Sequence, residues 1–528
     1  MQEKSINLMT IKEASKWASE YLGKDVTASN ISYLLQYGRV ENVSEDNKTL
    51  IPIENLINYY LSIKKKERDW VDKLGSDINW SLSFNNLKES ERTKHVHRLH
   101  PYKGKFIPQL VEYFLDEHLN DFKNEIYFHK GDIVLDPFCG SGTTLVQANE
   151  LGIHAIGVDI SNFNSLITNV KIAQYNELNL SRIIDEITIA LQNFTDRSRI
   201  IPFERELEKS LSDFNNKYFP SPEFKVQIRL GLVCEDDYGL DKSRLFEPIY
   251  LDLVKKYSIN LDQANIDSFI DKWYISHIRQ EVMFVRDLIM DIRDPLIKNL
   301  MITILSRTMR SCRATTHSDL ATLKDPVVTP YYCHKHGKIC KPIFSILQWW
   351  SRYCKDTIKR INQFSQLKTN TFQVCLTGDS RSIDLVNALE ITWPSLAHLV
   401  KKQRIKGVFS SPPYVGLIDY HDQHAYSYDL FRFERRDDLE IGALSKGQGI
   451  EARQSYIQSI TDVIMNCRKW LSEDFNIFLV ANDKYDLYPE IVENSGMKIV
   501  NKHVRPVLNR TERDKNAYSE TIFHIKER

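Results

Sequence analysis

Two acidic residues and the glycines between them have types and a spacing that indicate a ligand-binding function. Asp136 opens the segment Asp136-Pro137-Phe138-Cys139-Gly140-Ser141-Gly142-Thr143-Thr144. Glycines let a ligand approach the backbone closely, and a helix that starts after such a turn presents free N–H groups. Asp159 follows roughly 20 residues after Asp136, the spacing at which an acid meets a ribose hydroxyl. The pattern therefore predicts that this segment binds a nucleoside.

A second string has residue types that suit an amine substrate. Ser411-Pro412-Pro413-Tyr414 follows the apolar run Val408-Phe409-Ser410. An exocyclic amine of a nucleobase is a poor nucleophile, because its lone pair is delocalised into the ring. Ser411 Oγ and the Pro412 carbonyl can accept its N–H bonds and localise that lone pair, and the two prolines stiffen the loop. Tyr414 offers a face on which a base can stack.

Both strings lie at the ends of expected strands. Apolar and alternating runs predict strands at 131–135, 153–159, 371–380, 407–410 and 475–480, followed by a closing antiparallel pair at 497–505 and 521–526. Helical patterns separate these runs, so the fold class is α/β. Open α/β sheets bind ligands at the carboxyl ends of their strands, which is where both strings would lie.

Together the two strings resemble motifs I and IV of the S-adenosylmethionine (SAM)-dependent DNA methyltransferases that act on exocyclic amino groups. The resemblance covers roughly residues 95–170 and 371–528. It implies a Rossmann-like methyltransferase sheet, SAM as the cofactor and double-stranded DNA as the substrate. The target amine cannot meet the methyl group inside a duplex, so it also implies base flipping.

The resemblance also assigns residues to the two ligands. Lys105, Phe106 and Pro108 match motif X, in which the lysine could bind the cofactor carboxylate and Phe106 could wall the pocket. Asp379 matches motif III, where an acid accepts a hydrogen bond from the adenine amino group, and it can also cap a helix. The predicted cofactor set is Lys105, Phe106, Pro108, Asp136, Phe138, Gly140, Gly142, Thr143, Asp159 and Asp379, and the predicted catalytic set is Ser411, Pro412, Pro413 and Tyr414.

The first residue of the catalytic string bears on the target base. In this family a serine there is typical of enzymes that methylate cytosine N4, and an asparagine or aspartate is typical of those that methylate adenine N6. We therefore expect a site-specific cytosine-N4 DNA methyltransferase of a restriction-modification or related defence system, with a cognate restriction endonuclease as a partner. Adenine N6, an RNA substrate, and a DNA-binding regulator with an inactive methyltransferase body stay open as alternatives.

The pattern divides the chain into four parts. Residues 67–171 and 371–528 form the two halves of the methyltransferase domain, and residues 172–370 form a mostly helical insertion that is the expected target recognition region. Residues 1–66 resemble the helix-turn-helix of excisionase-like and winged-helix modules. Thr10 and Glu13 predict a capping box on its first helix. Its second helix would present Ser29, Asn30, Ser32 and Tyr33 to bases. The alternative is a helical bundle that holds a partner protein.

Three clusters of side chains allow further interpretations. The insertion has helical patterns at 178–194, 270–293 and 296–311. Arg307, Arg310 and Arg313 fall on one helical face. This row is either exposed to solvent or in contact with DNA phosphates. His95, His97 and His100 are expected at the surface or facing DNA. Cys333, His336 and Cys340 could form a small zinc site with Cys312 or Cys354, but paired Cys-x-x-Cys units are missing, so we expect no metal.

The length and composition of the chain limit the fold and function classes that are possible. The chain has 528 residues, a hydrophobic content of 42%, and equal numbers of basic and acidic residues, 70 each. A chain of this length predicts roughly two to four domains, and DNA binding would need positive charge concentrated locally. No apolar run approaches the ~20 residues of a membrane span. The eight scattered cysteines suit a reducing cytoplasm. A P-loop string and the Pro-Cys-x-x-Cys of zinc deaminases are both missing, which disfavours those two enzyme classes.

Overall fold

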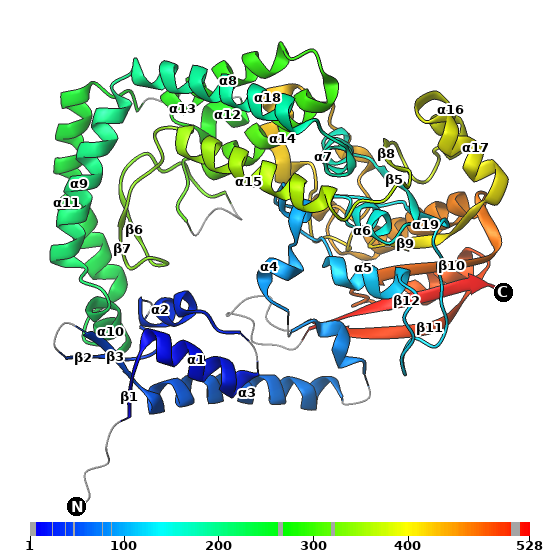
Figure 1. The fold of residues 1–528 in the computed structure, drawn as a ribbon, viewed down its shortest axis with the longest axis horizontal. Helices are drawn as coiled ribbons and strands as arrows, with labels where there is room; N and C mark the ends of the chain where they lie inside the picture. The colour runs from blue at the N-terminus through cyan, green and yellow to red at the C-terminus, as the bar shows by residue number, and fades with distance from the viewer. Residues whose placement is uncertain are drawn as a thin grey trace, which may run out of the picture. The chain divides into compact units, whose positions relative to one another are not determined.

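The structure is a computed structural model that describes residues 7–23, 25–36, 38–45, 48–75, 78–85, 87–261, 268–317, 323–507 and 518–528. The chain forms two compact units, each built from three separate stretches of sequence. The first unit contains Met1–Lys73, Gln192–Glu281 and Ser311–Ile346, and the second contains Leu74–Leu191, Val282–Arg310 and Leu347–Arg528. Figure 1 shows the elements of both.

A seven-stranded sheet is the centre of the second unit, in the order β11-β12-β10-β9-β4-β5-β8. Its parallel strands are β4 (Ile133–Asp136), β5 (His154–Asp159), β8 (Gln373–Thr377), β9 (Ile405–Ser410) and β10 (Leu471–Ala481). The last two strands, β11 (Met497–Pro506) and β12 (Ser519–Glu527), are antiparallel. This sheet confirms the predicted α/β class, including the closing antiparallel pair.

The strand order reverses at β4. From β4 the chain continues to β5 on one side, and it returns much later to β9 on the other side. Such a switch point opens a crevice at the carboxyl ends of the two central strands. Val134 pairs with Gly407 and Leu135 with Val408, so the strands that precede the two sequence strings lie next to each other.

Helices cover the sheet of the second unit. Side chains of α16 (Leu385–Thr392), α17 (Pro394–Gln403), α19 (Ile450–Arg468) and α20 (Tyr488–Asn494) form one continuous apolar core with β4, β5, β8, β9 and β10. Helices α6 (Thr143–Glu150) and α7 (Asn162–Ile172) contact β4, β5 and β8. The unit also contains α4 (Glu89–Arg92), α5 (Pro108–Leu115), α15 (Leu347–Ser365) and α18 (Ala425–Phe431), together with most of α8 (Glu177–Asp196), α13 (Ser276–Met290) and α14 (Pro295–Ser311).

The amino-terminal part of the first unit is a small mixed module. It consists of β1 (Leu8–Thr10), α1 (Ile11–Leu22), α2 (Ala28–Gln36), β2 (Val43–Glu45), β3 (Lys48–Pro52) and α3 (Ile53–Leu74), with the three strands in the antiparallel order β1-β3-β2. The predicted capping box is confirmed, because Thr10 N–H donates to the Glu13 carboxylate at 2.8 Å and Glu13 N–H donates to Thr10 Oγ1. On α2, Ile31, Leu34 and Leu35 are buried, whereas Ser29, Asn30, Ser32 and Tyr33 are exposed.

The rest of the first unit comes from the long insertion. Its helices are α9 (Ile200–Tyr218), α10 (Glu223–Arg229), α11 (Glu235–Tyr257) and α12 (Phe269–Trp273), and its strands are β6 (Tyr331–Cys333) and β7 (Lys338–Cys340). Aromatic rings pack against α9: Phe214 lies edge-on to Phe246 of α11, and Phe203 lies edge-on to Phe344, which follows β7. The expected helix at 270–293 is broken into α12 and α13, because Tyr274 adopts an extended conformation and ends α12.

Two surface assignments from the sequence are wrong. Helix α14 ends at Ser311, so Arg313 does not lie on it. Arg307 is buried, and its guanidinium pairs with Asp356 at 2.7 Å, so it belongs neither to a solvated row nor to a row of phosphate contacts. His95, His97 and His100, which were expected at the surface, are also buried. Their partners come from distant parts of the sequence: the Glu150 carboxylate, for example, lies 2.7 Å from His95 Nε2.

Candidate active site

Four neighbouring strands of the second unit deliver the predicted residues to one edge of the sheet. Strand β4 ends at Asp136 and β5 ends at Asp159. Asp379 follows β8, and Ser411 follows β9. Because these strands are parallel, all four residues come to the same edge.

The first cleft opens at this edge of the sheet. It is lined by predicted residues from five segments of the chain: Lys105, Phe106, Phe138, Gly140, Thr143, Asp159, Asp379, Ser411 and Pro413. The structure thus brings together residues that are up to about 300 positions apart in the sequence.

The glycine turn that forms one wall of the cleft depends on Gly142. This residue has φ +75°, and a Cβ placed on it would lie 2.5 Å from Thr168 Cγ2. Thr168 Oγ1 in turn donates to the Gly140 carbonyl at 3.2 Å. Because Gly142 has no side chain, Thr168 of α7 can pack directly against the turn and hold it in place. Gly140 lines the cleft.

The two acids of the turn have different roles in the structure. Asp159 lines the cleft, and its carboxylate accepts from Gly140 N–H at 2.7 Å and from Ser161 N–H at 2.9 Å. Asp136 does not line the cleft. It is buried beneath the turn, where it accepts from Ser410 Oγ at 2.6 Å and thereby ties β4 to β9. Burial raises the pKa of each of these carboxyl groups to about 6.

Two other charged groups line the cleft from outside the turn. The Asp379 carboxylate accepts hydrogen bonds from the Arg381 guanidinium: Nη2 donates at 2.7 Å, and Nε donates to the two oxygens at 2.9 and 3.0 Å. Burial alone would raise the pKa of Asp379, but the bonds from Arg381 lower it below its ordinary value. Lys105 Nζ donates to the His97 carbonyl at 2.7 Å, and burial lowers the pKa of Lys105 to about 8.

A second groove adjoins the first cleft and is wider. Ser411 and Lys105 line both hollows, while Pro412 and Tyr414 line only the second groove. Ser411 Oγ donates its proton to the Val480 carbonyl at 3.2 Å. The hydroxyl oxygen of Ser411 therefore keeps its lone pairs for another donor, at the place where the two hollows meet.

A hydrogen-bonded chain behind Tyr414 fixes this wall of the groove. The Tyr414 hydroxyl donates to Glu520 at 3.1 Å, and Glu520 accepts from Arg505 at 2.5 Å. Arg505 also donates to the Leu82 carbonyl at 2.9 Å. Because Arg505 and Glu520 are opposite each other on β11 and β12, the antiparallel end of the sheet positions the tyrosine ring.

A relative from Methanocaldococcus jannaschii, named Type II methyltransferase M.MjaII, resembles this chain along almost its whole length. The two sequences are 46% identical over 525 residues, which is 98% of this chain and 97% of the relative. A family model for N6/N4 DNA methylases matches residues 27–169. The chain belongs to the DNA amino-methyltransferase family. The sequence-based assignment to this family is thereby confirmed.

Two further relatives share only part of this methyltransferase. Type II methyltransferase M.MvaI from Kocuria varians is 29% identical over 186 residues, which is 35% of this chain and 39% of the relative. Type II methyltransferase M.BsoBI from Geobacillus stearothermophilus is 35% identical over 157 residues, which is 28% of this chain and 29% of the relative. In the described part of this methyltransferase, every helix is too short or too polar to cross a membrane.

SAM is the methyl donor that this family implies, and the first cleft fits it. A nucleoside needs acceptors for its hydroxyl and amino groups, and Asp159 and Asp379 supply carboxylates there. Phe106 and Phe138 offer apolar walls, and the Lys105 ammonium offers a partner for a carboxylate. The cleft thus combines the apolar and charged groups that an amino-acid-bearing nucleoside requires.

Three predicted residues of the methyltransferase lie behind the cleft rather than on it. Pro108 is the first residue of α5, and Asp136 and Gly142 support the glycine turn. Conversely, sequence reasoning missed several lining residues. Tyr102 and Tyr420 line the cleft, with their rings stacked and their centroids 6.1 Å apart. Other unpredicted lining residues are Asn164, Leu439 and Glu440.

Proposed function

We propose that this protein transfers the methyl group of SAM to the exocyclic N4 of a cytosine that is extruded from double-stranded DNA. The observation that carries the proposal is the position of Ser411, which lines both the first cleft and the second groove. A methyl donor in the cleft and a base in the groove would meet there. When bound, SAM supplies an electrophilic methyl group on a sulfonium.

The protein's own part is to prepare the amine. Ser411 Oγ and the Pro412 carbonyl accept the two N–H bonds of the base, which favours a tetrahedral nitrogen with a localised lone pair. The bond from Ser411 to Val480 orients the hydroxyl so that its oxygen faces the amine. The prolines hold both acceptors in place before the substrate arrives, so less of the binding energy is lost in ordering the loop.

The second groove is the proposed site of the extruded base. Its tyrosine rings offer flat apolar faces, which suit stacking with a nucleobase. Tyr414 stands beside Ser411 in the string, and its ring is fixed through Glu520. The tyrosines that line the groove are Tyr414, Tyr420, Tyr456, Tyr485, Tyr488 and Tyr518.

The choice of cytosine rests on Ser411 being a serine, since that residue is typical of the cytosine-N4 members of the family. We further propose that the enzyme modifies DNA within a restriction-modification system, as the names of its type II relatives suggest. The exposed side chains Ser29, Asn30, Ser32 and Tyr33 on α2 are proposed to contact DNA, and residues 172–370 to choose the site.

The test is to identify the methylated base. Purified protein is incubated with duplex DNA and SAM, and the DNA is digested to nucleosides for mass spectrometry. We expect N4-methyldeoxycytidine, and a loss of about 100-fold or more in its rate of formation for Ser411→Ala. Ser472→Ala is the matched control, because Ser472 is partly exposed at the start of β10 and lines neither hollow.

Each other outcome has a distinct meaning. N6-methyldeoxyadenosine alone would exclude cytosine and assign the enzyme to adenine. Methylation of structured RNA in preference to duplex DNA would exclude DNA as the substrate. SAM binding by calorimetry without any methylated nucleoside would exclude the proposed activity and favour a DNA-binding regulator.

A further inference from the structure

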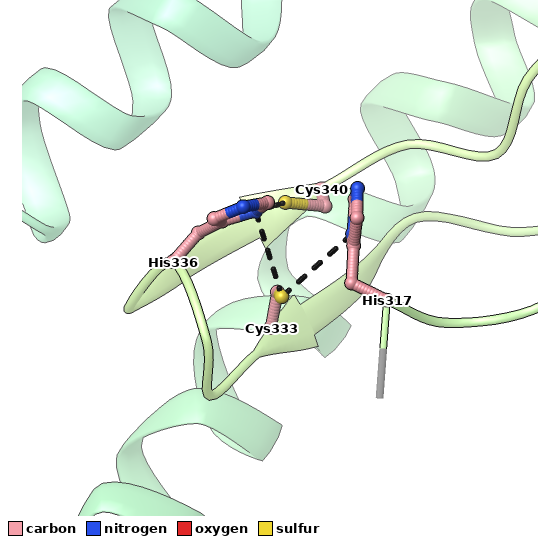
Figure 2. A group of neighbouring side chains, drawn as sticks. All are labelled: His317, Cys333, His336 and Cys340. Atoms are coloured by element: carbon pink, nitrogen blue, oxygen red, sulfur yellow. Dashed lines mark hydrogen bonds between the residues drawn. The ribbon is translucent and has the colours of Figure 1, made fainter. Parts of the chain in front are cut away.

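Four side chains that bind metal ions elsewhere in proteins converge in the first unit. They are His317, Cys333, His336 and Cys340, and one ligand atom from each lies within 4.8 Å of all the others. Figure 2 shows the four side chains pointing toward one another. Two thiols and two imidazoles form one of the ligand sets of structural zinc sites.

The distances between these atoms suit a tetrahedral ion. Zn–S bonds of about 2.3 Å and Zn–N bonds of about 2.0–2.1 Å place neighbouring ligand atoms roughly 3.3–3.8 Å apart. Cys333 Sγ lies 3.8 Å from His317 Nδ1 and 3.6 Å from His336 Nδ1. His336 Nδ1 lies 3.3 Å from Cys340 Sγ. A pair of thiol–imidazole hydrogen bonds would account for two contacts but not for the convergence of all four atoms.

The hairpin of β6 and β7 is shaped to present three of these residues. Tyr331 pairs with Cys340 and Cys333 pairs with Lys338, so the two cysteines lie on the same face. The turn between them folds back tightly, with the N–H groups of His336 and Gly337 both donating to the Cys333 carbonyl. Gly337 has φ +62°, a conformation that L side chains rarely adopt. The turn therefore returns His336 to the side of Cys333.

The opposite face of the hairpin is anchored to helices, which leaves the cysteine face to the metal. Ile339 is buried, and its N–H and C=O both pair with the Asn215 side chain of α9 at 3.0 Å. Tyr332 packs against Gly239 of α11, and its hydroxyl donates to Glu235 at 2.8 Å. With one face held by α9 and α11, the positions of the thiols are fixed.

The geometry points to a structural zinc site formed by His317, Cys333, His336 and Cys340. The sequence suggested Cys312 or Cys354 as the fourth ligand; among the residues that the structure describes, the side chain that converges with the other three is His317. The Tyr331 hydroxyl lies 2.8 Å from His317 Nδ1, so the metal would replace that hydrogen bond. The ion would join the segment that follows α14 to the hairpin.

Another group of potential ligands does not carry the same inference. His95, His97 and Glu150 also lie within 4.8 Å of one another. However, Lys94 Nζ lies 2.6 Å from the Glu150 carboxylate, and His97 contacts Gln147 at 3.1 Å. A lysine ammonium already neutralises that carboxylate, whereas the thiols of the hairpin contact imidazoles and each other.

The test measures zinc in the full-length protein. Wild-type protein is purified in the presence of Zn²⁺, freed of excess metal by gel filtration, and analysed by inductively coupled plasma mass spectrometry. We expect one zinc per chain, and its loss in Cys333→Ser and His336→Ala. The matched controls are Cys234→Ser, an exposed cysteine outside the cluster, and His334→Ala. His334 is in the same turn as His336, but its ring faces Glu235 and Asp236 of α11 at 3.6 Å.

A second measurement does not depend on the variants folding. Demetallated wild-type protein is titrated with Co²⁺, and we expect thiolate-to-cobalt charge transfer together with the visible bands of a tetrahedral site. Zinc below a tenth of an equivalent in the wild type, combined with no such bands, would overturn the assignment, as would full zinc retention in both ligand variants. SAM binding by the second unit is followed in parallel and should not change, so failure of the zinc site and failure of the proposed methyl transfer are separable.

Discussion

The buried carboxylate Asp136 allows a prediction that can be worked through to a magnitude. It lies at the end of β4 with 1% of its surface exposed, and Ser410 Oγ and Phe138 N–H donate to it. Burial raises the pKa of this carboxyl from 3.8 to about 6 in spite of those bonds. At neutral pH the folded protein therefore carries a charge that the surroundings do not fully compensate. Asp136→Asn removes the charge and keeps the shape.

The sign of the effect follows from proton linkage. Because the folded pKa lies above the unfolded one, the folded state binds more protons between pH 3.8 and about 6. This group's contribution to stability is therefore largest below pH 3.8 and is lost as the pH rises through 6. The difference of about two units corresponds to roughly 3 kcal/mol at pH 7–8. An uncharged amide in place of the carboxylate would avoid this loss, so the variant should be more stable near pH 8 and about equal to the wild type near pH 4.

The assay is thermal unfolding of the full chain between pH 4 and pH 8. Two units need not unfold together, so the transition of the second unit is identified as the one that added SAM shifts upward. At pH 8 we expect a midpoint roughly 5 °C higher for Asp136→Asn, shrinking toward zero near pH 4. A midpoint below that of the wild type at pH 8, approaching the wild-type value near pH 4, would refute the reasoning, because it would show that the charge itself stabilises the turn.

The remaining predictions concern the walls of the two hollows. SAM affinity should fall as the pH rises from 7 to 9, because Lys105, whose pKa burial lowers to about 8, then loses the charge that attracts a carboxylate; calorimetry should show a flat profile for Lys105→Met. Gly142→Ala should destabilise the second unit by about 2 kcal/mol or more, since φ +75° is strained and its Cβ would lie 2.5 Å from Thr168; Gly449→Ala, with open space around it, should be near neutral by the same melting assay. Glu520→Gln should slow methylation about tenfold with SAM affinity unchanged, because it weakens the hydrogen bond that holds Tyr414 in the second groove. An equal loss of methylation rate and of SAM affinity would argue against a role confined to that groove.

The sequence predicted the sheet and the site where the signal is local. Asp136 follows Ile133-Val134-Leu135 and Ser411 follows Val408-Phe409-Ser410, so their places at strand ends can be read from neighbouring residues. The glycine turn is similar, since strand, turn and helix occupy one continuous stretch. Helix α11 was not predicted, because Pro248 interrupts its pattern, although the helix continues through it.

What the sequence did not predict depends on contacts between distant segments. The three-residue spacing of Arg307, Arg310 and Arg313 predicted an exposed or DNA-contacting row. Asp356, which pairs with Arg307, comes close to it only through the packing of α14 against α15. His317 lies 16 residues before Cys333, so sequence spacing alone did not indicate that it belongs to the cluster. Glu440 lines the first cleft because His421 N–H donates to it at 2.7 Å, and the sequence around Glu440 has no pattern that indicates such a role.

The strand order explains how so long an insertion can interrupt the domain without separating its two strings. The chain leaves the sheet after β5 and α7, and it returns at β8, which is the edge strand next to β5. An edge strand pairs on one side only, so the connection that precedes it can be long without disturbing the interior of the sheet. The contact that matters for chemistry is between β4 and β9, on the other side of β5. The insertion therefore enters at a position where its size has little effect on the distance between the glycine turn and Ser411.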